Sequence, residues 1–549
     1  MDRRIPLLLL TATLFAGCRC EAPRPPPPVS SAPPVRDAAR PVEPVEIPAE
    51  LVWSGVDPQT LDPAKIHDLS AWWIGVNVFE GLLVPAPGDG PPRLGVAAEP
   101  PIPSEDRLTW TFRLRPYARW SDGRPVVAGD FVYAWRRTVD PATHSPNAED
   151  MRVIAGADAL LDGKATDPAT LGVEAPDDHT LVVRLVNPVP YFLAQTATPP
   201  FFPVRRDVVE AHGERWTLPA HIVGNGAFTL AEWKPRDRII LQRSEHYWDR
   251  ANVALPRATM LHSETEDTSM RWYESGRIHW LNTVAPDKVI RLLSEGRQDL
   301  HSGPMLCHIG VVFRLDRAPF DDVRVRRAFA MAIDRDRLVK HVLRRGDTPA
   351  STYVPVLFET LSGYRGPEGV RYDPEGARAL LAEAGHAQGA GLPPIVYVYN
   401  TYDTNRSIAE FLQRSLKENL GVQIELENLE WKSFLARLAE GTFQMARGGW
   451  CGLPDPSLWL DAFRTGAGSN YGGFSSPEYD ALLGRIAAEP DAGRRHALIA
   501  EGERILDEAQ ILAPLYFPVR YYLLKPFVQG LEPQSMDVHL LKYVSLGLP

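Results

Sequence analysis

The sequence predicts an α/β protein that contains more than one domain, and three observations support this fold class. Patterns typical of helices and of strands alternate along the chain from Leu51 onward, as they do in α/β proteins. The chain has 549 residues, which is more than one hydrophobic core usually holds. Apolar residues make up 44% of the chain and charged residues 23%, which is the balance of an ordinary globular protein.

Three segments have the pattern of β-strands. Residues 108–115 alternate apolar and polar side chains, as a strand with one buried face does. Residues 180–186 are rich in leucine, valine and threonine, and residues 238–241 form a third, shorter candidate. We therefore expect strands in these three segments.

Three segments have the periodicity and the end signals of helices. One apolar stripe at helical spacing follows the Asp321-Asp322 pair, either of which can cap a helix N-terminus. The Ser476-Pro477 pair marks the start of a second helix, and a third is expected over residues 374–384, before a glycine. The two stripes consist of Val325, Ala328, Phe329, Ala332 and Ile333, and of Tyr479, Leu482, Leu483 and Ile486.

The N-terminus has the features of an export signal. A short basic start precedes a mostly apolar run over residues 5–17, which is too short to span a bilayer and is typical of a secretory signal peptide, residues 1–17. Small residues before Cys18 resemble a bacterial lipobox, which predicts cleavage there and lipidation of Cys18. The alternative is a plain signal peptide followed by an incidental cysteine.

A proline-rich segment follows Cys18. Proline occupies ten of the 27 positions in residues 22–48. Such a tract favours extended polyproline II at about 3.1 Å per residue, a reach of up to roughly 80 Å. We expect residues 18–50 to tether a soluble body to a membrane through lipid alone, in the periplasm or at the cell surface, because no later stretch is long and apolar enough to span a bilayer.

Charge and motifs exclude several function classes. The net charge is −10, so the basic face of a nucleic-acid-binding protein is not expected. The sequence contains no H-E-x-x-H, G-x-S-x-G or P-loop motif, and its histidines lack metal-ligand spacing. The four cysteines form neither a disulfide scaffold nor a zinc set. We therefore expect no enzyme activity, no metal and no cofactor.

Five groups of short segments, in order along the chain, carry a family resemblance. They are residues 61–63 with 79–83, 120–123 with 130–135, 225–228, 320–326 with 333–335, and 430–432 with 447–451. Together these segments resemble the oligopeptide-binding proteins of bacterial ABC importers, which form family 5 of the extracellular solute-binding proteins. Each match alone is weak, but five in the family order are specific.

The resemblance implies a two-lobe α/β fold like that of the periplasmic binding proteins of type II, large cluster, with an additional third domain. Two strands cross between the lobes, near residues 305–307 and near Arg520. The implied boundaries are residues 51–79, 207–306 and 521–549 for lobe I, 80–206 for the additional domain, and 307–520 for lobe II.

The resemblance also implies a disulfide between Cys307 and Cys451. This bond would close a loop of about 145 residues, for which chain entropy gives a stabilisation of about 4–5 kcal/mol. Both cysteines would lie in lobe II, so the bond would leave the hinge free. The alternative is two free, buried thiols.

Four implied ligand contacts lie on two segments of lobe II. Arg447, Trp450 and Cys451 match a segment that lines the family's cleft, where an arginine can hold a peptide carboxylate with two hydrogen bonds. Trp431 matches a tryptophan that forms the flat wall of a side-chain pocket. The alternatives are an internal ion pair for Arg447 and plain core packing for Trp431.

Several positions depart from the family pattern. The family aspartate that pairs with the ligand's α-ammonium aligns with Leu453, and Asp455 is the candidate replacement or, alternatively, a capping residue before proline. Two family residues that hold the ligand's C-terminus are also replaced: a histidine appears as Asn405 beside Arg406, and a lysine as Leu343. Two further cleft residues differ as well, because a family tyrosine appears as Asn147 and a family glutamate as His67.

The function implied by the resemblance is that of a monomeric solute-binding lipoprotein of an ABC transporter. It would bind peptides in the cleft between the lobes by hinge closure and deliver them to the transmembrane permease subunits. The first alternative is the same fold binding a dipeptide, a cell-wall peptide, an opine or a metal chelate. The second is a lipoprotein receptor that signals without transport, and the third is a hydrolase, for which no nucleophile–base pair is visible.

Overall fold

The structure is a computed structural model that describes residues 47–452 and 454–548. The predicted signal peptide, Cys18 and nearly all of the proline-rich tether lie outside the described residues. From Ile47 onward the chain forms one compact unit. None of the described helices combines the length and the apolar character that a membrane crossing requires.

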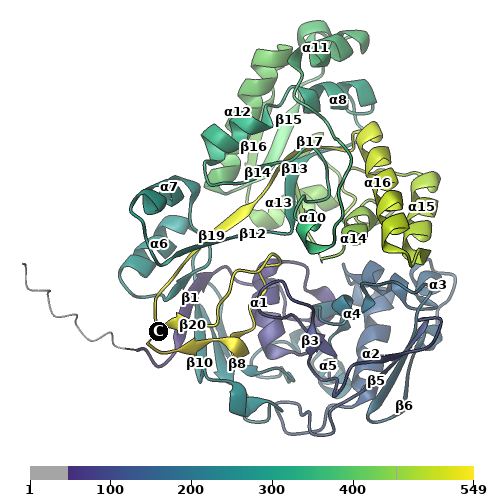
Figure 1. Ribbon diagram of the computed structural model, residues 1–549, viewed down its shortest axis with the longest axis vertical. Coiled ribbons are helices and arrows are strands. Elements are labelled where there is room, and N and C mark those ends of the chain that lie inside the picture. Colours follow the sequence, from purple (N-terminus) through teal and green to yellow (C-terminus); the bar gives the residue numbers. More distant parts are fainter. Residues whose placement is uncertain (1–46, 453, 549) are drawn as a thin grey trace, which may run out of the picture. The chain divides into compact units, whose positions relative to one another are not determined.

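One large sheet has seven strands, in the order β12-β19-β11-β1-β10-β9-β8 (Figure 1). Strand β1 is parallel to both of its neighbours, and the other pairs are antiparallel. The strand β19 comes from near the C-terminus, so distant parts of the chain build this sheet. Its strands are β1 Leu51–Gly55, β8 Phe228–Lys234, β9 Arg238–Arg243, β10 Arg257–His262, β11 Trp280–Leu281, β12 Leu300–Pro304 and β19 Val519–Leu524.

A second large sheet has six strands, in the order β14-β18-β13-β17-β15-β16. Strand β13 lies in its interior and is antiparallel to both β17 and β18. Cys307 and Cys451 face each other in the register of β13 and β17. The strands are β13 Cys307–Phe313, β14 Thr348–Pro349, β15 Val396–Asn400, β16 Glu425–Leu429, β17 Met445–Cys451 and β18 Leu512–Phe517.

The chain crosses between the two large sheets twice. It leaves the seven-stranded sheet after β12 and enters β13 through Met305 and Leu306, and it returns from β18 to β19 through Pro518. The two crossings are hydrogen-bonded neighbours, because Met305 N donates to Pro518 O at 3.0 Å. Leu306 N also donates to Ser535 O at 2.7 Å, so the C-terminal segment supports the same place.

A smaller, four-stranded sheet is formed by the part of the chain between β1 and β8. Its order is β4-β5-β7-β6, and helix α2 packs against it. Two of the strands predicted from sequence, residues 108–115 and 180–186, are β5 and β7, and the third is β9. The bounds are β4 Ile102–Pro103, β5 Thr109–Arg113, β6 Val173–Asp177, β7 Thr180–Arg184 and α2 Ala128–Val139; two short pairs are β2 Leu83–Val84 with β3 Arg93–Leu94, and β20 Val528–Gln529 with β21 Ser545–Leu546.

The three predicted helices are present. Helix α8 begins after Asp322, whose side chain accepts from Arg324 N, and α15 begins after Ser476, whose hydroxyl accepts from Tyr479 N. Helix α11 ends at Glu383 and is followed by Gly385 at φ +90°, a conformation that favours glycine. The helices of residues 314–511 are α8 Val323–Met331, α9 Arg335–Arg337, α10 Phe358–Leu361, α11 Pro374–Glu383, α12 Asp403–Leu420, α13 Trp431–Ala439, α14 Pro456–Asp461, α15 Pro477–Ala488 and α16 Ala492–Ala509.

The remaining described helices flank the seven-stranded and four-stranded sheets in the sequence. They are α1 Leu69–Val78, α3 Ala157–Leu161, α4 Phe192–Gln195, α5 Arg206–His212, α6 Glu266–Glu274 and α7 Pro286–Ser294, together with a short 3₁₀ helix, Ala148–Val153, that bears on the site below.

The hydrophobic core is divided. One large cluster joins the seven-stranded and four-stranded sheets, with Trp53 and Trp135 among its fully buried members. A separate cluster packs the six-stranded sheet against α8, α11 and α12, and another, around Trp459 and Tyr479, holds α14, α15 and α16 together. Burying a large apolar side chain contributes about 1.5–3 kcal/mol, so each cluster stabilises its own half of the molecule. The two crossings thus join two large sheets, each of which packs its own hydrophobic cluster.

Candidate functional site

Strand β17 carries three of the residues predicted to line a ligand site. Arg447, Trp450 and Cys451 all belong to this strand, which lies between β13 and β15. Cys451 forms a disulfide with Cys307 across 144 residues of sequence, as predicted, although Cys451 itself is exposed and only Cys307 is buried. Because the bond joins neighbouring strands of one sheet, it spans neither crossing.

Arg447 is a half-buried cation without a carboxylate partner. Among the described residues it makes no ion pair, and its Nε is buried without a hydrogen-bond partner. Tyr397 and Tyr516 lie beside it: burial raises the pKa of both hydroxyls, and the charge of Arg447 partly offsets this rise. The internal ion pair that was the alternative for Arg447 is thus absent from the described part of the chain.

Trp450 and Trp431 present different environments. The Trp450 ring packs edge-on against Trp459, with 4.6 Å between centroids, and it lies so close to Gly452 that a Cβ there would approach its ring to 2.1 Å. Trp431 is the first residue of α13, stacks on Phe434 at 5.9 Å and remains 39% exposed. Plain core packing therefore does not describe Trp431, whose ring keeps a free surface.

Asp455 is buried and already has partners. It caps α14, accepting from Ser457 N at 2.9 Å, which is the capping role that sequence left open as an alternative. Its two carboxylate oxygens also lie 3.2 and 3.0 Å from Nη1 of Arg495 on α16. Sequence reasoning missed this arginine, which compensates the charge of Asp455.

His67 and Asn147 lie in neighbouring loops. The Asn147 amide donates to Ile66 O at 2.7 Å, which places Asn147 beside the residue that precedes His67. His67 is exposed, and its Nδ1 lies 3.0 Å from Lys65 O. The structure therefore brings these two predicted site residues together through the backbone of residues 64–67, not through a direct contact.

Asn405 and Arg406 lie in the first turn of α12. Asn405 is buried and donates to the main-chain and side-chain oxygens of Asn400, at 3.2 and 3.0 Å, whereas Arg406 is exposed. The nearby Tyr402 faces Glu266 of α6, beyond the crossings in the other half of the molecule. Burial raises the pKa of Glu266, and the Tyr402 hydroxyl partly offsets that rise.

Three acidic residues that interact with one another electrostatically were not predicted from sequence. Asp461 belongs to α14, whereas Glu149 and Asp150 belong to the 3₁₀ helix 148–153. Burial raises the pKa of Asp150 to about 7, and the charge of Asp461 adds to the rise. No periodicity marks these residues in the sequence; the only signal is their proximity to the predicted residues Asn147 and Asp455.

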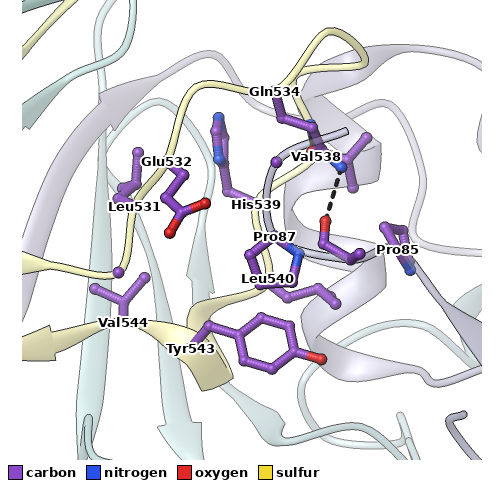
Figure 2. A pocket seen from close by; sticks show the side chains of 13 residues that line it. Pro85, Pro87, Leu531, Glu532, Gln534, Val538, His539, Leu540, Tyr543 and Val544 are labelled. Atoms are coloured by element: carbon purple, nitrogen blue, oxygen red, sulfur yellow. Dashed lines mark hydrogen bonds between the residues drawn. The ribbon is translucent and has the colours of Figure 1, made fainter. Parts of the chain in front are cut away.

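A hollow elsewhere in the molecule contains none of the predicted site residues. It measures about 310 Å³, part of it open to solvent, and lies between residues 85–88 and the C-terminal segment 530–544. Figure 2 shows Pro85, Leu540 and Tyr543 around it. The amide of Gln534 donates to Ala86 O at 3.1 Å and joins the two segments, so this hollow is a local feature of that contact.

Comparison with known proteins links this arrangement to a family. Residues 92–471 match the family model described as bacterial extracellular solute-binding proteins, family 5 Middle. The chain is 39% identical over 486 residues to the periplasmic oligopeptide-binding protein OppA of Escherichia coli, covering 87% of this chain and 88% of OppA. It is 34% identical to the periplasmic murein peptide-binding protein MppA of the same organism, over 86% of this chain and 88% of MppA.

Solved structures agree over most of the chain. The murein tripeptide binding protein MppA of Escherichia coli superimposes with a TM-score of 0.85 at 34% identity, covering 91% of this chain and 98% of MppA. Haemophilus influenzae OppA in complex with RPPGFSPFR gives 0.85 at 29% identity, over 91% and 100%. The unliganded open form of MppA gives only 0.65, over 91% and 97%. The likeness is therefore greater to the first MppA structure than to the open form.

Proposed function

The chain belongs to family 5 of the bacterial extracellular solute-binding proteins, and on that premise we propose that it captures peptides between two lobes and delivers them to an ABC permease. The observation that carries this proposal is the 39% identity to an oligopeptide-binding protein over 87% of the chain. The relatives compared above are solute-binding proteins, and no catalytic step is proposed for this one.

The proposed mechanism is closure about the two crossings. Lobe I comprises residues 51–79, 207–306 and 521–549, lobe II comprises 307–520, and residues 80–206 form the additional domain. The crossings at Met305–Leu306 and Pro518 are adjacent, so a small change in their dihedral angles can rotate one lobe against the other. Ligand shifts the population toward the closed form because it contacts both lobes only there. The different TM-scores for two forms of MppA support such a motion.

Arg447 is proposed to bind a carboxylate of the solute. A partly buried guanidinium without a counter-ion is costly, because its charge is removed from water without compensation. A ligand carboxylate can supply two parallel, charge-assisted hydrogen bonds to it. Arg406, exposed at the start of α12, is the second candidate for this end of the ligand.

The remaining contacts with the ligand are proposed to accept peptides of varied sequence. Extended peptide can hydrogen-bond to exposed main chain near Cys451, while Trp431 and Trp450 offer flat apolar walls that accept varied side chains. His67 and Asn147 are proposed to face the ligand from the loops that they occupy. Asn405 is engaged with Asn400, so its proposed role is to fix that loop near the ligand.

The proposal places the protein outside the cytoplasm, in the periplasm or at the cell surface, as a monomer. Cys18 is proposed to carry the lipid, and residues 18–50 to act as the tether. Relatives named periplasmic support this location. Nucleic acid, metal and cofactor have no part in it.

A cell-wall peptide is the second candidate ligand. It is favoured by the 34% identity to a murein peptide-binding protein and by the replacement of the family's ammonium-binding aspartate with Leu453. Asp455 remains a candidate partner for the ligand's ammonium group. Its carboxylate already lies 3.0 Å from Arg495, however, and this ion pair weakens its electrostatic attraction for a second cation.

Native mass spectrometry of the purified full chain tests the proposed function. We expect a co-purifying mass that is released on unfolding and fragments at amide bonds. Arg447→Ala protein, prepared in parallel, should retain less of it. A bound species without amide bonds, or peptide binding that is absent even at millimolar concentration, would contradict the proposal.

A further inference from the structure

An irregular segment near the C-terminus contacts both crossings between the two large sheets. We call residues 534–540 the C-terminal strap. The strap contains no helix and no strand, yet Ser535 and Asp537 within it are only 2% and 3% exposed. Buried main chain outside regular structure needs specific hydrogen-bond partners, because water cannot supply them. The partners of the strap therefore show which parts of the chain it holds.

The first crossing is bonded on both of its sides. Leu306 N donates to Ser535 O of the strap at 2.7 Å. The carbonyl of the same residue accepts from Gly452 N at 3.1 Å, directly after strand β17 of the six-stranded sheet. Leu306 is thus tied to the strap through its N–H and to the six-stranded sheet through its carbonyl.

The second crossing has the same arrangement on two consecutive residues. Val519 N donates at 2.8 Å to Oδ1 of Asp347, whose side chain is fully buried and pairs with Arg345 at 2.7 Å. The next residue, Arg520, forms an ion pair with Asp537 of the strap. Asp347 precedes strand β14 of the six-stranded sheet. One buried carboxylate therefore holds the crossing from that sheet, and another holds it from the strap.

The conformation of Asp537 is fixed by contacts around the whole residue. Its φ is +54°, a left-handed value that residues other than glycine rarely adopt. Its N–H donates to Gln534 O at 3.0 Å, and its carbonyl accepts from Trp73 Nε1 at 2.5 Å. Its Oδ1 lies 3.1 Å from Nε2 of His539. Such a conformation persists where the surroundings determine it, so the partner of Arg520 is held in place.

The strap is in turn anchored to an early part of the chain. The main-chain N and the hydroxyl of Ser535 donate to Oδ1 of Asp89 at 2.8 and 2.6 Å. The amide of Asn77, in α1, donates to His539 O at 3.1 Å. The strap therefore links both crossings to α1 and to the segment that ends at Asp89.

We propose that the C-terminal strap is a clamp that confines the pivot of lobe closure to a few peptide units. This inference rests on the proposed function and deepens it by naming what controls the movement. With Leu306 and Arg520 held by the strap, rotation is limited to residues 305–307 and 517–519. Main chain that is already ordered does not have to be ordered on closure. The clamp therefore lowers the entropy cost of closing around any solute.

The clamp predicts a signature that differs from loss of a ligand contact. The strap contains none of the predicted site residues, so it acts on the equilibrium between the open and closed forms. A change in that equilibrium multiplies the apparent dissociation constant of every solute by the same factor. A lost contact would instead weaken some solutes more than others.

The test uses calorimetry on the full chain with two unlike peptides, trialanine and trilysine. Arg520→Met breaks the ion pair with Asp537, and Asp89→Ala removes the acceptor that anchors Ser535. We expect both variants to lose about 3- to 10-fold in affinity, with equal factors for the two peptides. Arg297→Met is the matched control, because Arg297 pairs with Asp299 at 2.7 Å outside both crossings, and it should leave both affinities unchanged.

Scattering of the ligand-free proteins gives a second measurement. A released pivot allows wider opening, so both variants should have a larger radius of gyration than wild type without peptide. At saturating peptide the difference should disappear. Asp89 is exposed, so Asp89→Ala is expected to fold even if Arg520→Met does not, and an unchanged thermal midpoint checks this.

The outcomes separate the clamp from the proposed function. Unequal losses for the two peptides, unchanged affinities, or ligand-free curves that superimpose on wild type would each overturn the clamp and leave peptide binding intact. Wild-type protein that binds neither peptide would contradict the proposed function, and the ligand-free scattering curves alone would then decide for or against the clamp.

Discussion

Arg447 and Asp150 are charged residues near the candidate site that form no ion pair with any described residue, and they differ in how they are placed. Arg447 lies on β17, an interior strand of the six-stranded sheet, beside two buried tyrosines and four residues from a disulfide. Asp150 lies on a short 3₁₀ helix, and the charge of Asp461, on α14, adds to the rise of its pKa. The first position lies within one sheet, whereas the second depends on segments that are far apart in the sequence.

This difference separates what the two residues can do. A preformed cation can attract a carboxylate in the open form, since nothing has to move before it binds. The electrostatic energy of two acids on separate segments depends on the distance between those segments. On the proposed function, affinity for a carboxylate-bearing solute should therefore depend mostly on Arg447.

The largest expected effect separates Asp150 from its paired neighbour Asp455. Asp455→Asn leaves Arg495 buried without a counter-ion, which typically costs about 3–5 kcal/mol in the free energy of unfolding. Asp150→Asn breaks no pair and removes a charge that burial and neighbouring acids disfavour, so it should not lower the unfolding free energy. Chemical denaturation of both variants measures the contrast.

The double variant Asp455→Asn/Arg495→Met controls for this interpretation. It removes both buried charges, so much of the lost stability should return. If Asp455→Asn is as stable as wild type but loses binding of free-amine peptides and keeps binding of their N-acetylated forms, then Asp455 is the partner of the ligand's ammonium group.

The next largest effect concerns Arg447, the proposed partner of the ligand's carboxylate. Arg447→Ala should weaken binding of a peptide with a free C-terminal carboxylate about 100-fold, and binding of the C-terminally amidated peptide far less, because only the carboxylate needs the guanidinium. Calorimetry with the two peptides measures the difference, and Arg414→Ala, at an exposed arginine of α12, is the control. Similar losses for both peptides would mean that Arg447 supports the sheet and does not bind the ligand.

The smallest effect is a pH dependence. The pKa of Asp150 is raised to about 7, so its carboxyl becomes protonated as the pH falls through 7 toward the ordinary aspartate range. A carboxyl whose pKa is raised in the folded state favours folding at low pH, and this contribution is lost as the pH rises through 7. Asp150 is exposed, so solvent screening keeps the contribution small. Asp150→Asn should therefore gain more unfolding free energy over wild type at pH 8 than at pH 5, as measured by chemical denaturation. His308, whose pKa burial lowers to about 3, is present in both proteins and cancels from that difference. Equal gains at the two pH values would contradict the raised pKa.

Local sequence signals predicted the helices and strands well, but they did not predict the ion pairs around Asp455. The Ser476 cap and the apolar stripe of α15 are properties of neighbouring residues, and both are present in the structure. The pairing of Cys307 with Cys451 came from the family resemblance and is also present. By contrast, the Asp455–Arg495 pair depends on how α14 packs against α16, forty residues apart, which no local pattern encodes.

Asp150 shows the same limit more clearly. It lies in an irregular segment without periodicity, and part of the rise in its pKa comes from Asp461, which is more than 300 residues away in the sequence. Asp455 is an intermediate case: its position before a proline indicated a cap, but its ionic partner required the tertiary structure. Helices and strands thus follow from short-range pattern, whereas contacts between residues far apart in the sequence do not.

Small-angle X-ray scattering of the full chain, with and without a saturating peptide shown by calorimetry to bind, tests the central claim most directly. Closure of two lobes about the crossings near Met305 and Pro518 predicts that the radius of gyration falls when peptide is added. Arg447→Ala at the same peptide concentration should show a smaller fall. Scattering curves that superimpose although calorimetry shows binding would contradict the account.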